Sequence, residues 1–323
     1  LSGAVCMAGA ALAQSVRIPL SYDEPDLDSV GRLVWRGGLE LDLDDSTFGG
    51  LSALDIDSAG NSLVALSDRG RWFRFALEHD ARGFLVAARP SGSGVLHGVG
   101  NRPLPRVRER DSESLVRLSD GSLVVAYELR HRLLRYPAAH PPFSAAPRWL
   151  VPPPGIYSAP ANAGIEALTA FGPDLLFALS ENLRLADGLT LGWIGDGRHW
   201  APFRYRPGDG YRPTGAATLP GGDILVLERR LTMLGGFTAR IAQLPQDAIL
   251  AAARDAHQVL EGDEVARLQA PLNIDNFEGI ATHQAANGET LVYLVSDDNQ
   301  FALQNTLLLA FALRTAPETA GLR

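Results

Sequence analysis

The sequence predicts an all-β fold, a β-propeller of five four-stranded blades, and a recurring pair of strands is the main observation behind this prediction. Five times along the chain, an apolar strand and a turn rich in Gly, Asp or Asn precede a second apolar strand that ends on an acidic residue. These second strands are Leu63–Asp68, Leu123–Glu128, Leu175–Glu181, Ile224–Glu228 and Leu291–Asp297. Six blades are the alternative, if a long connection hides one repeat.

Each repeat opens on a hairpin and continues into further strands. The first strands of the hairpins are expected at Leu51–Ile56, Glu113–Leu118, Glu166–Phe171, Thr214–Leu219 and Glu278–His283. Third strands are expected at Trp72–Leu77, Leu133–Tyr136, Leu189–Ile194, Phe237–Leu244 and Thr306–Leu313, and weaker fourth strands near Leu85–Ala88, Trp149–Val151 and Phe203–Arg206. One helix is expected at Asp247–Ala256, after Pro245, on the outside of the fourth blade.

The two ends of the repeat region predict how the ring closes. The last repeat runs out of chain after its third strand, whereas Leu33–Leu43 precedes the first repeat and has no partner of its own. We expect this N-terminal strand to pair with Thr306–Leu313, because closure leaves no sheet edge unpaired.

Composition indicates one soluble globular domain over residues 14–323, with 46% hydrophobic and 20% charged residues and no linker that divides it. The net charge is −8, so a nucleic acid backbone is not an expected partner. All 29 basic residues are arginine, which excludes Schiff-base chemistry and a P-loop lysine.

The first thirteen residues, LSGAVCMAGAALA, are small and apolar and resemble the remnant of an export signal peptide that ends on Ala11-Leu12-Ala13. The single cysteine, Cys6, lies inside this segment, which suits an oxidising compartment. No later apolar run is long enough to span a membrane. We therefore expect a monomer that is periplasmic or secreted, with no transmembrane segment.

The acids of the repeat are expected to gather at one mouth of the central channel. In a propeller blade the innermost strand starts, and the second strand ends, at the same face. Glu113, Glu166 and Glu278 occupy the first position, with Gly49 and Thr214 in the other two blades, and the second position holds Asp68, Glu128, Glu181, Glu228 and Asp297, the last followed by Asp298. All-oxygen ligation selects a hard cation, so Ca²⁺ is the expected cofactor. The expected metal ligands are Asp68, Glu113, Glu166, Glu278, Asp297 and Asp298.

Arginines follow most of these acids and support two interpretations. They can pair with the carboxylates, in which case no metal is needed, or they can form a site for an anionic substrate beside a metal. The residues expected to contact substrate are Arg69, Arg130, His131, Arg229 and Arg230. The seven histidines show no HExxH spacing, and no G-x-S-x-G elbow is present, so zinc hydrolase and serine esterase chemistry have little support.

Four motifs resemble those of the phytase-like β-propeller proteins, often described as having esterase-like activity of the phytase family. They are Ser67-Asp68-Arg69-Gly70, Leu227-Glu228-Arg229-Arg230, Asn276-Phe277-Glu278-Gly279-Ile280 and Val295-Ser296-Asp297-Asp298-Asn299. The resemblance covers about Val30 to Leu313 and implies a propeller, export and calcium-dependent phosphoester chemistry. Within these motifs Glu228, Arg229 and Arg69 are the expected catalytic residues.

The sequence thus favours an exported calcium-dependent hydrolase of phosphate or other anionic esters, with its site at the acidic mouth and a small anionic substrate. Two alternatives stay open. One is a non-catalytic propeller that binds a ligand or partner over the same face with structural calcium, and the other is a calcium-dependent lactonase.

Overall fold

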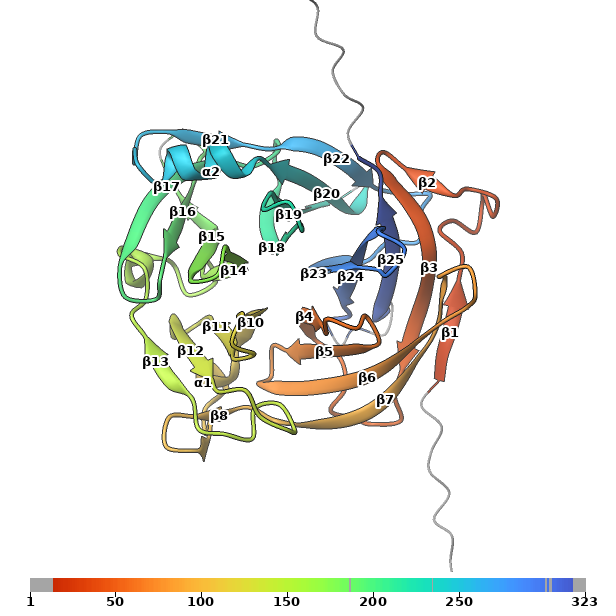
Figure 1. The fold of residues 1–323 in the computed structure, drawn as a ribbon, viewed down its shortest axis with the longest axis horizontal. Helices are drawn as coiled ribbons and strands as arrows, with labels where there is room; N and C mark the ends of the chain where they lie inside the picture. The colour runs from red at the N-terminus through yellow and green to blue at the C-terminus, as the bar shows by residue number, and fades with distance from the viewer. Residues whose placement is uncertain (1–13, 186, 234, 300, 302–303, 316–323) are drawn as a thin grey trace, which may run out of the picture.

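The computed structural model describes residues 14–315 except 186, 234, 300 and 302–303. Five sheets stand around a central axis as the blades of a five-bladed β-propeller, so the predicted fold class is confirmed (Figure 1). The expected export segment and Cys6 lie outside the described residues. No helix of the described residues is long and apolar enough to cross a membrane.

Blades 1 and 2 each have four strands in chain order from the axis outward. Blade 1 consists of β4 (Leu51–Ile56), β5 (Ser62–Ser67), β6 (Arg71–His79) and β7 (Leu85–Val95). Blade 2 consists of β10 (Ser112–Arg117), β11 (Leu123–Tyr127), β12 (Arg132–Tyr136) and β13 (Arg148–Leu150). Between them lie the short strands β8 (His97–Gly98) and β9 (Arg102–Pro103), which pair with each other, and the helix α1 (Val107–Arg110).

Blades 3 and 4 follow the same plan, except that blade 3 gains a fifth strand from the connection between the third and fourth strands of blade 4. Blade 3 consists of β14 (Ile165–Phe171), β15 (Leu175–Arg184), β16 (Thr190–Gly195) and β17 (Trp200–Arg206), preceded by a 3₁₀ turn at Ile156–Ser158. Blade 4 consists of β18 (Arg212–Thr218), β19 (Ile224–Thr232), β20 (Gly236–Leu244) and β22 (Asp263–Leu268). The expected helix is shorter than predicted, α2 (Gln246–Ala252), and β21 (Val259–Glu261) after it adds a parallel fifth strand to blade 3.

Blade 5 closes the ring as predicted. Its inner strands are β23 (Asn276–Gln284), β24 (Thr290–Asp297) and β25 (Leu307–Leu313). The fourth strand is the N-terminal β3 (Leu33–Asp42), which pairs with β25 from Leu307 opposite Glu40 to Leu313 opposite Leu33. Outside β3 lie β1 (Gln14–Ile18) and the short β2 (Ser29–Val30), so the two ends of the described chain meet in one sheet (Figure 1).

The hydrophobic core lies between blades rather than at the axis. The buried apolar side chains of the described residues form five clusters, and each cluster joins the facing sides of two adjacent blades. The inner strands β4, β10, β14, β18 and β23 contact their neighbours around the axis. Because these contacts fix the position of every inner strand, they also fix the position of each residue at the channel mouth.

Candidate metal centre

A one-residue β-bulge near the start of every inner strand sets the geometry of the mouth. The strand pairing slips by one residue in each blade, at Ser52, Glu113, Glu166, Thr214 and Glu278. A bulge redirects the side chain of the extra residue. Ser52 and the three glutamates line one narrow cavity on the axis. Gly49, expected at this position in blade 1, is therefore wrong: the equivalent residue is Ser52.

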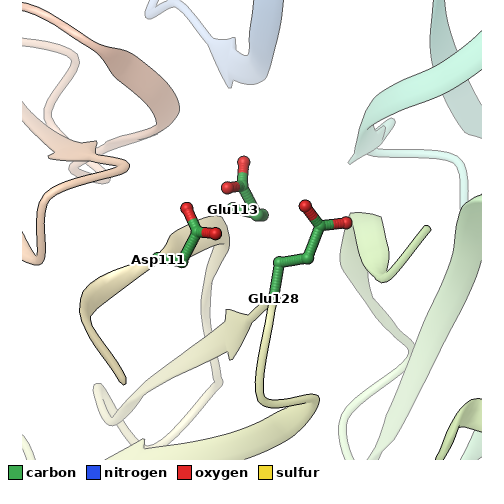
Figure 2. Close-up of side chains that lie close together, drawn as sticks. All are labelled: Asp111, Glu113 and Glu128. Carbon is green, nitrogen blue, oxygen red and sulfur yellow. The ribbon is translucent and has the colours of Figure 1, made fainter. Parts of the chain in front are cut away.

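Three carboxylates of blade 2 converge at the mouth: Asp111, Glu113 and Glu128 (Figure 2). Each offers one oxygen, and these oxygens all lie within 4.8 Å of one another. Asp111 and Glu113 stand at the start of β10, and Glu128 directly follows β11. The backbone N–H of Gly164 donates a hydrogen bond of 2.7 Å to Oε1 of Glu128, which fixes this carboxylate from the side of blade 3.

Burial raises the pKa of all three groups, and repulsion from other acids adds to it for Glu113 and Glu128. Desolvation is the main cause for each of them. The pKa of Glu128 rises to about 7, and that of Glu113 rises well above its usual value, with Glu166 and Asp111 adding repulsion. Two like charges 4 Å apart at an effective dielectric near 20 repel by about 4 kcal/mol. A divalent cation would remove this cost by taking the place of the retained protons.

No ion pair joins an arginine to Asp111, Glu113 or Glu128 within the part of the chain that the structure describes. Arg132 is the nearby cation whose charge lowers the pKa of Asp111, but its guanidinium lies over the ring of Tyr127, 3.9 Å from the centroid. The interpretation in which arginines neutralise the acids therefore does not account for this side of the mouth.

His131 is buried beside this cluster. Its Nε2 lies 3.1 Å from the carbonyl oxygen of Pro160, which is a hydrogen bond when Nε2 carries the proton. Its Nδ1 is buried and has no partner. A Cβ added at Gly164 would lie 3.1 Å from this Nδ1 and 3.2 Å from Oε1 of Glu128. The imidazole ring and the carboxylate are therefore neighbours. His131 therefore places a buried ring nitrogen with no hydrogen-bond partner in the described chain beside Glu128.

Asp68, Asp297 and Asp298 gather on the adjacent side of the mouth, where blades 5 and 1 meet. Oδ1 of Asp298 accepts the N–H of Gly50 at 2.9 Å, and its Oδ2 accepts the hydroxyl of Thr306 at 3.1 Å. Desolvation raises the pKa of Asp68 to about 6, with added repulsion from Asp111 and Asp298. Desolvation also raises the pKa of Asp297 to about 8, with repulsion from Glu278 and Asp68. The repulsion between Asp68 and Asp111 indicates that the acids of blades 5 and 1 interact electrostatically with those of blade 2.

The opposite side of the mouth holds an internal arginine. Nη1 of Arg229 lies 2.6 Å from Oε1 of Glu278, and its Nη2 lies 3.3 Å from Oε1 of Glu181. Its charge also lowers the pKa of the buried Glu166, although desolvation leaves that pKa well above the usual range. Arg229 is thus occupied by the acids of blades 3 and 5. The arginine-paired interpretation fits this side of the mouth.

Glu228 does not join the other acids. Its side chain is fully buried, and its oxygens accept hydrogen bonds from the Tyr205 hydroxyl at 2.6 Å and from Nη1 of Arg240 at 2.7 Å. Tyr205 belongs to β17 of blade 3, and Arg240 belongs to β20 of blade 4. The carboxylate of Glu228 thus lies in the interior between these blades and not in the channel.

The other expected substrate contacts differ in access. Arg69 and Arg130 have side chains that are 49% and 65% exposed, and their carboxylate partners are Asp68 and Glu109. Arg230 lies over the ring of Tyr211 at 4.7 Å. Of the expected set, Arg69 and Arg130 thus have the most exposed side chains.

Sequence reasoning missed Asp111 and left Glu128 out of the expected metal ligands. Asp111 belongs to no repeated position, because it lies two residues before the bulge at Glu113. The signal that could have found it is the local pattern Asp111-Ser112-Glu113, in which two acids of an extended segment lie on the same side.

The donor set fits a hard cation. Calcium takes oxygen ligands at 2.3–2.6 Å, so two oxygens on opposite sides of one ion are about 5 Å apart. The spread of 4.8 Å among the three carboxylate oxygens lies within this limit. Asp111, Glu113 and Glu128 can therefore share one ion of this size.

A family comparison identifies the family of this chain. The model of the phytase-like family, described as esterase-like activity of phytase, matches residues 46–300. This chain belongs to the phytase-like family. The match includes blades 1 to 4, the two inner strands of blade 5 and all the acids at the mouth. No curated protein matches the chain.

Solved structures that resemble this phytase-like chain share only low sequence identity with it. A protein of unknown function from Dyadobacter fermentans is 14% identical, with 93% of this chain and 90% of that chain covered and a TM-score of 0.47. An inactive variant of virginiamycin B lyase from Staphylococcus aureus, with quinupristin, is 11% identical, with 92% and 98% covered and a TM-score of 0.41. A luciferin-regenerating enzyme is 9% identical, with 93% and 98% covered and a TM-score of 0.43.

Proposed function

We propose that this phytase-like propeller is a calcium-dependent hydrolase of phosphate or other anionic esters, with its site on the blade 2 side of the channel mouth. The observation that carries the proposal is the convergence of Asp111, Glu113 and Glu128 without an arginine partner in the described chain. Three neighbouring carboxylates that form no ion pair with an arginine in the described chain favour a hard divalent cation.

The proposed roles follow from access and position. Asp111, Glu113 and Glu128 would hold the ion, which when bound supplies Lewis-acid polarisation of an ester oxygen. Asp68, whose pKa burial raises to about 6, can accept or return a proton near neutral pH. Arg69 and Arg130 would bind the anionic group of the substrate through their exposed guanidinium forks.

Three expected site residues receive other roles in this proposal. Glu228 stabilises the interior through Arg240 and Tyr205. Arg229 neutralises Glu181 and Glu278 instead of binding substrate. His131 is a positioning residue that packs beside Glu128, because it is buried.

A screen of phosphomonoesters, phosphodiesters and lactones, each with EDTA or with millimolar Ca²⁺, tests the proposal. We expect calcium-dependent turnover of at least one phosphoester, and its loss in Glu113→Gln and Asp111→Asn. The matched control Asp174→Asn removes a carboxylate from the turn between β14 and β15, at the other end of the blade, and should keep full turnover.

Other outcomes separate the alternatives. Turnover of lactones alone would favour the lactonase. Calcium binding without turnover of any substrate would favour a binding propeller with structural calcium. Absence of calcium binding in calorimetry would contradict the metal site itself.

We also propose that the protein is periplasmic or secreted, on the basis of residues 1–13 and the absence of cysteine after Cys6, and that it is a monomer. Fractionation of cells that express the gene, with and without these thirteen codons, tests export, and sedimentation of the purified protein tests the oligomeric state.

A further inference from the structure

A hollow beside the channel mouth, between blades 1 and 2, is lined by the three arginines Arg69, Arg71 and Arg110. It is built from connections at the end of the disc where the acids lie: the segment before β4, the turn after β5 and the segment between β7 and β10. Its volume is about 280 Å³, several times the roughly 30 Å³ that a water molecule occupies in the liquid. The hollow can therefore hold a hydrated anion.

Two pairs of neighbouring residues separate the charges between the hollow and the acids. In Asp68-Arg69 and in Arg110-Asp111 the acid belongs to the acidic mouth, whereas the arginine lines the hollow. Gly70 allows these two segments to approach, since a Cβ at Gly70 would lie 2.9 Å from Cβ of Arg110. Positive and negative groups are thus sorted onto adjoining surfaces by successive residues of the same two turns.

In the described chain, two of the three guanidinium groups of the hollow form no ion pair with a carboxylate, and the third, that of Arg69, pairs with Asp68. Within the described residues, neither Arg71 nor Arg110 forms an ion pair, and Nε of Arg71 is buried with no partner. Arg110 is held by the carbonyl oxygen of Leu104, which accepts from Nε at 2.7 Å. Asp68 lies 4.0 Å from Nε of Arg69. Asp45 accepts two hydrogen bonds from Thr47, which lower its pKa, and the charge of Arg71 lowers that pKa further.

We infer that this hollow is a binding site for a phosphate or sulfate group that needs no metal. An arginine fork matches the tetrahedral oxyanion in geometry and charge, and three arginines line this one hollow. Val95, Leu96 and Leu104 form an apolar wall next to the arginines. If the proposed function holds, the substrate carries a second anionic group beyond the ester at the acidic mouth, with a carbon skeleton between them.

The test measures anion binding to the protein in EDTA at constant ionic strength, by calorimetry with phosphate, sulfate and acetate as probes. We expect saturable binding of phosphate and sulfate, tighter than that of acetate. Arg69→Gln and Arg71→Gln should each weaken it by about tenfold, the effect of losing one charge-assisted hydrogen bond. Arg69 is half exposed, so its substitution does not threaten folding.

The matched control is Arg74→Gln on the same strand, β6, whose guanidinium bonds to Ser91 outside the hollow. It should leave anion binding unchanged. The inference is overturned if no saturable binding occurs without metal, or if Arg74→Gln weakens binding as much as Arg71→Gln.

Two outcomes distinguish a failure of this inference from a failure of the proposed function. Anion binding that appears only after calcium is added would overturn the metal-free site and would support a cation at the mouth. Metal-free binding that depends on Arg71, in a protein that hydrolyses no ester with calcium, would support the anion site and contradict the hydrolase.

Discussion

The carboxylates of Asp68 and Asp298 lie against the backbone of Gly50 and Gly49, because neither glycine has a side chain that would block them. A Cβ at Gly50 would lie 2.3 Å from Oδ1 of Asp68, and one at Gly49 would lie 2.7 Å from Oδ2 of Asp298. Both glycines have positive φ, of +109° at Gly49 and +64° at Gly50. Backbone conformation and lack of a side chain are therefore both required here.

Gly50→Ala should destabilise the protein and displace the Asp68 carboxylate. The left-handed conformation alone costs a non-glycine residue about 1–2 kcal/mol, and the contact with Asp68 adds to this. Gly83→Ala is the matched control, since its φ is +81° but no atom lies within 4 Å of the added Cβ. Urea unfolding should show a larger loss of stability for Gly50→Ala, and calcium-dependent turnover should fall in that variant alone. Equal effects of the two substitutions would contradict the contact argument.

Glu228→Leu tests whether this residue is structural or catalytic. Removing one partner of a buried ion pair leaves a charge uncompensated and typically costs about 3 kcal/mol. We expect this loss in urea unfolding, together with unchanged turnover per folded molecule. The double variant Glu228→Leu with Arg240→Leu should lose less stability than the two single variants added together. Loss of turnover without loss of stability would instead restore the catalytic role expected from the sequence.

At the scale of elements, the alternating strand pattern was sufficient to predict the blades, but not the local irregularities that build the site. Inner strand β4 has the predicted bounds, and β3 pairs with β25 as expected. The bulges could not be predicted, because a one-residue slip depends on how the neighbouring inner strands pack. Strand β22 was missed since its sequence, DEVARL, has only two strongly apolar residues and lies among charged ones.

The position of the candidate site could be predicted from the sequence, but the partners of its individual acids could not. Repetition along the chain predicted that acids gather at one mouth, since it depends only on blade topology. Which acids meet an arginine depends on side-chain reach across blades, as in Arg229 with Glu278, a contact between residues 49 positions apart. Glu228 occupies the repeated position, yet its side chain turns to Arg240, which sequence spacing does not reveal.

Truncation tests the importance of closure for the ring. Removal of residues 1–42 deletes β3 and exposes the edge of β25, whose residues from Leu307 to Ala312 are buried. We expect loss of cooperative thermal unfolding and aggregation through the open edge. Removal of residues 1–18 deletes only the outer β1 and should lower the melting temperature much less. A cooperative transition in the longer truncation would contradict the role assigned to β3.

At the scale of the whole molecule, the fold brings carboxyl groups that repel one another into a small, partly desolvated region at the channel mouth. Desolvation raises the pKa of Asp68 to about 6, of Glu128 to about 7 and of Asp297 to about 8. The pKa of an unfolded carboxyl group is near 4, so at neutral pH the folded protein without metal binds more protons than the unfolded chain. Its stability must therefore fall as pH rises from about 4 to about 8.

Two histidines oppose this trend in part of the range. Burial lowers the pKa of His79 and His283, so the unfolded chain binds more protons at these groups and stability rises with pH up to their unfolded pKa near 6.5. The carboxyl groups dominate the slope above pH 6.5, because fewer than half of the unfolded histidines are still protonated there. In EDTA, the melting temperature should fall between pH 6.5 and 8, and Asp297→Asn should make this fall shallower.

Calcium should reverse the same slope, because it replaces the retained protons and then binds only the folded state. At a free concentration about 100 times Kd the ion would stabilise the protein by about 2.7 kcal/mol. Since the ligands must lose their protons first, the calcium-dependent rise in melting temperature should be larger at pH 8 than at pH 6.5. Scanning calorimetry at the two pH values, with EDTA and with calcium, measures both slopes. A metal-free melting temperature that stays constant or rises from pH 6.5 to 8 would mean that the acids of the mouth are already neutralised by arginines.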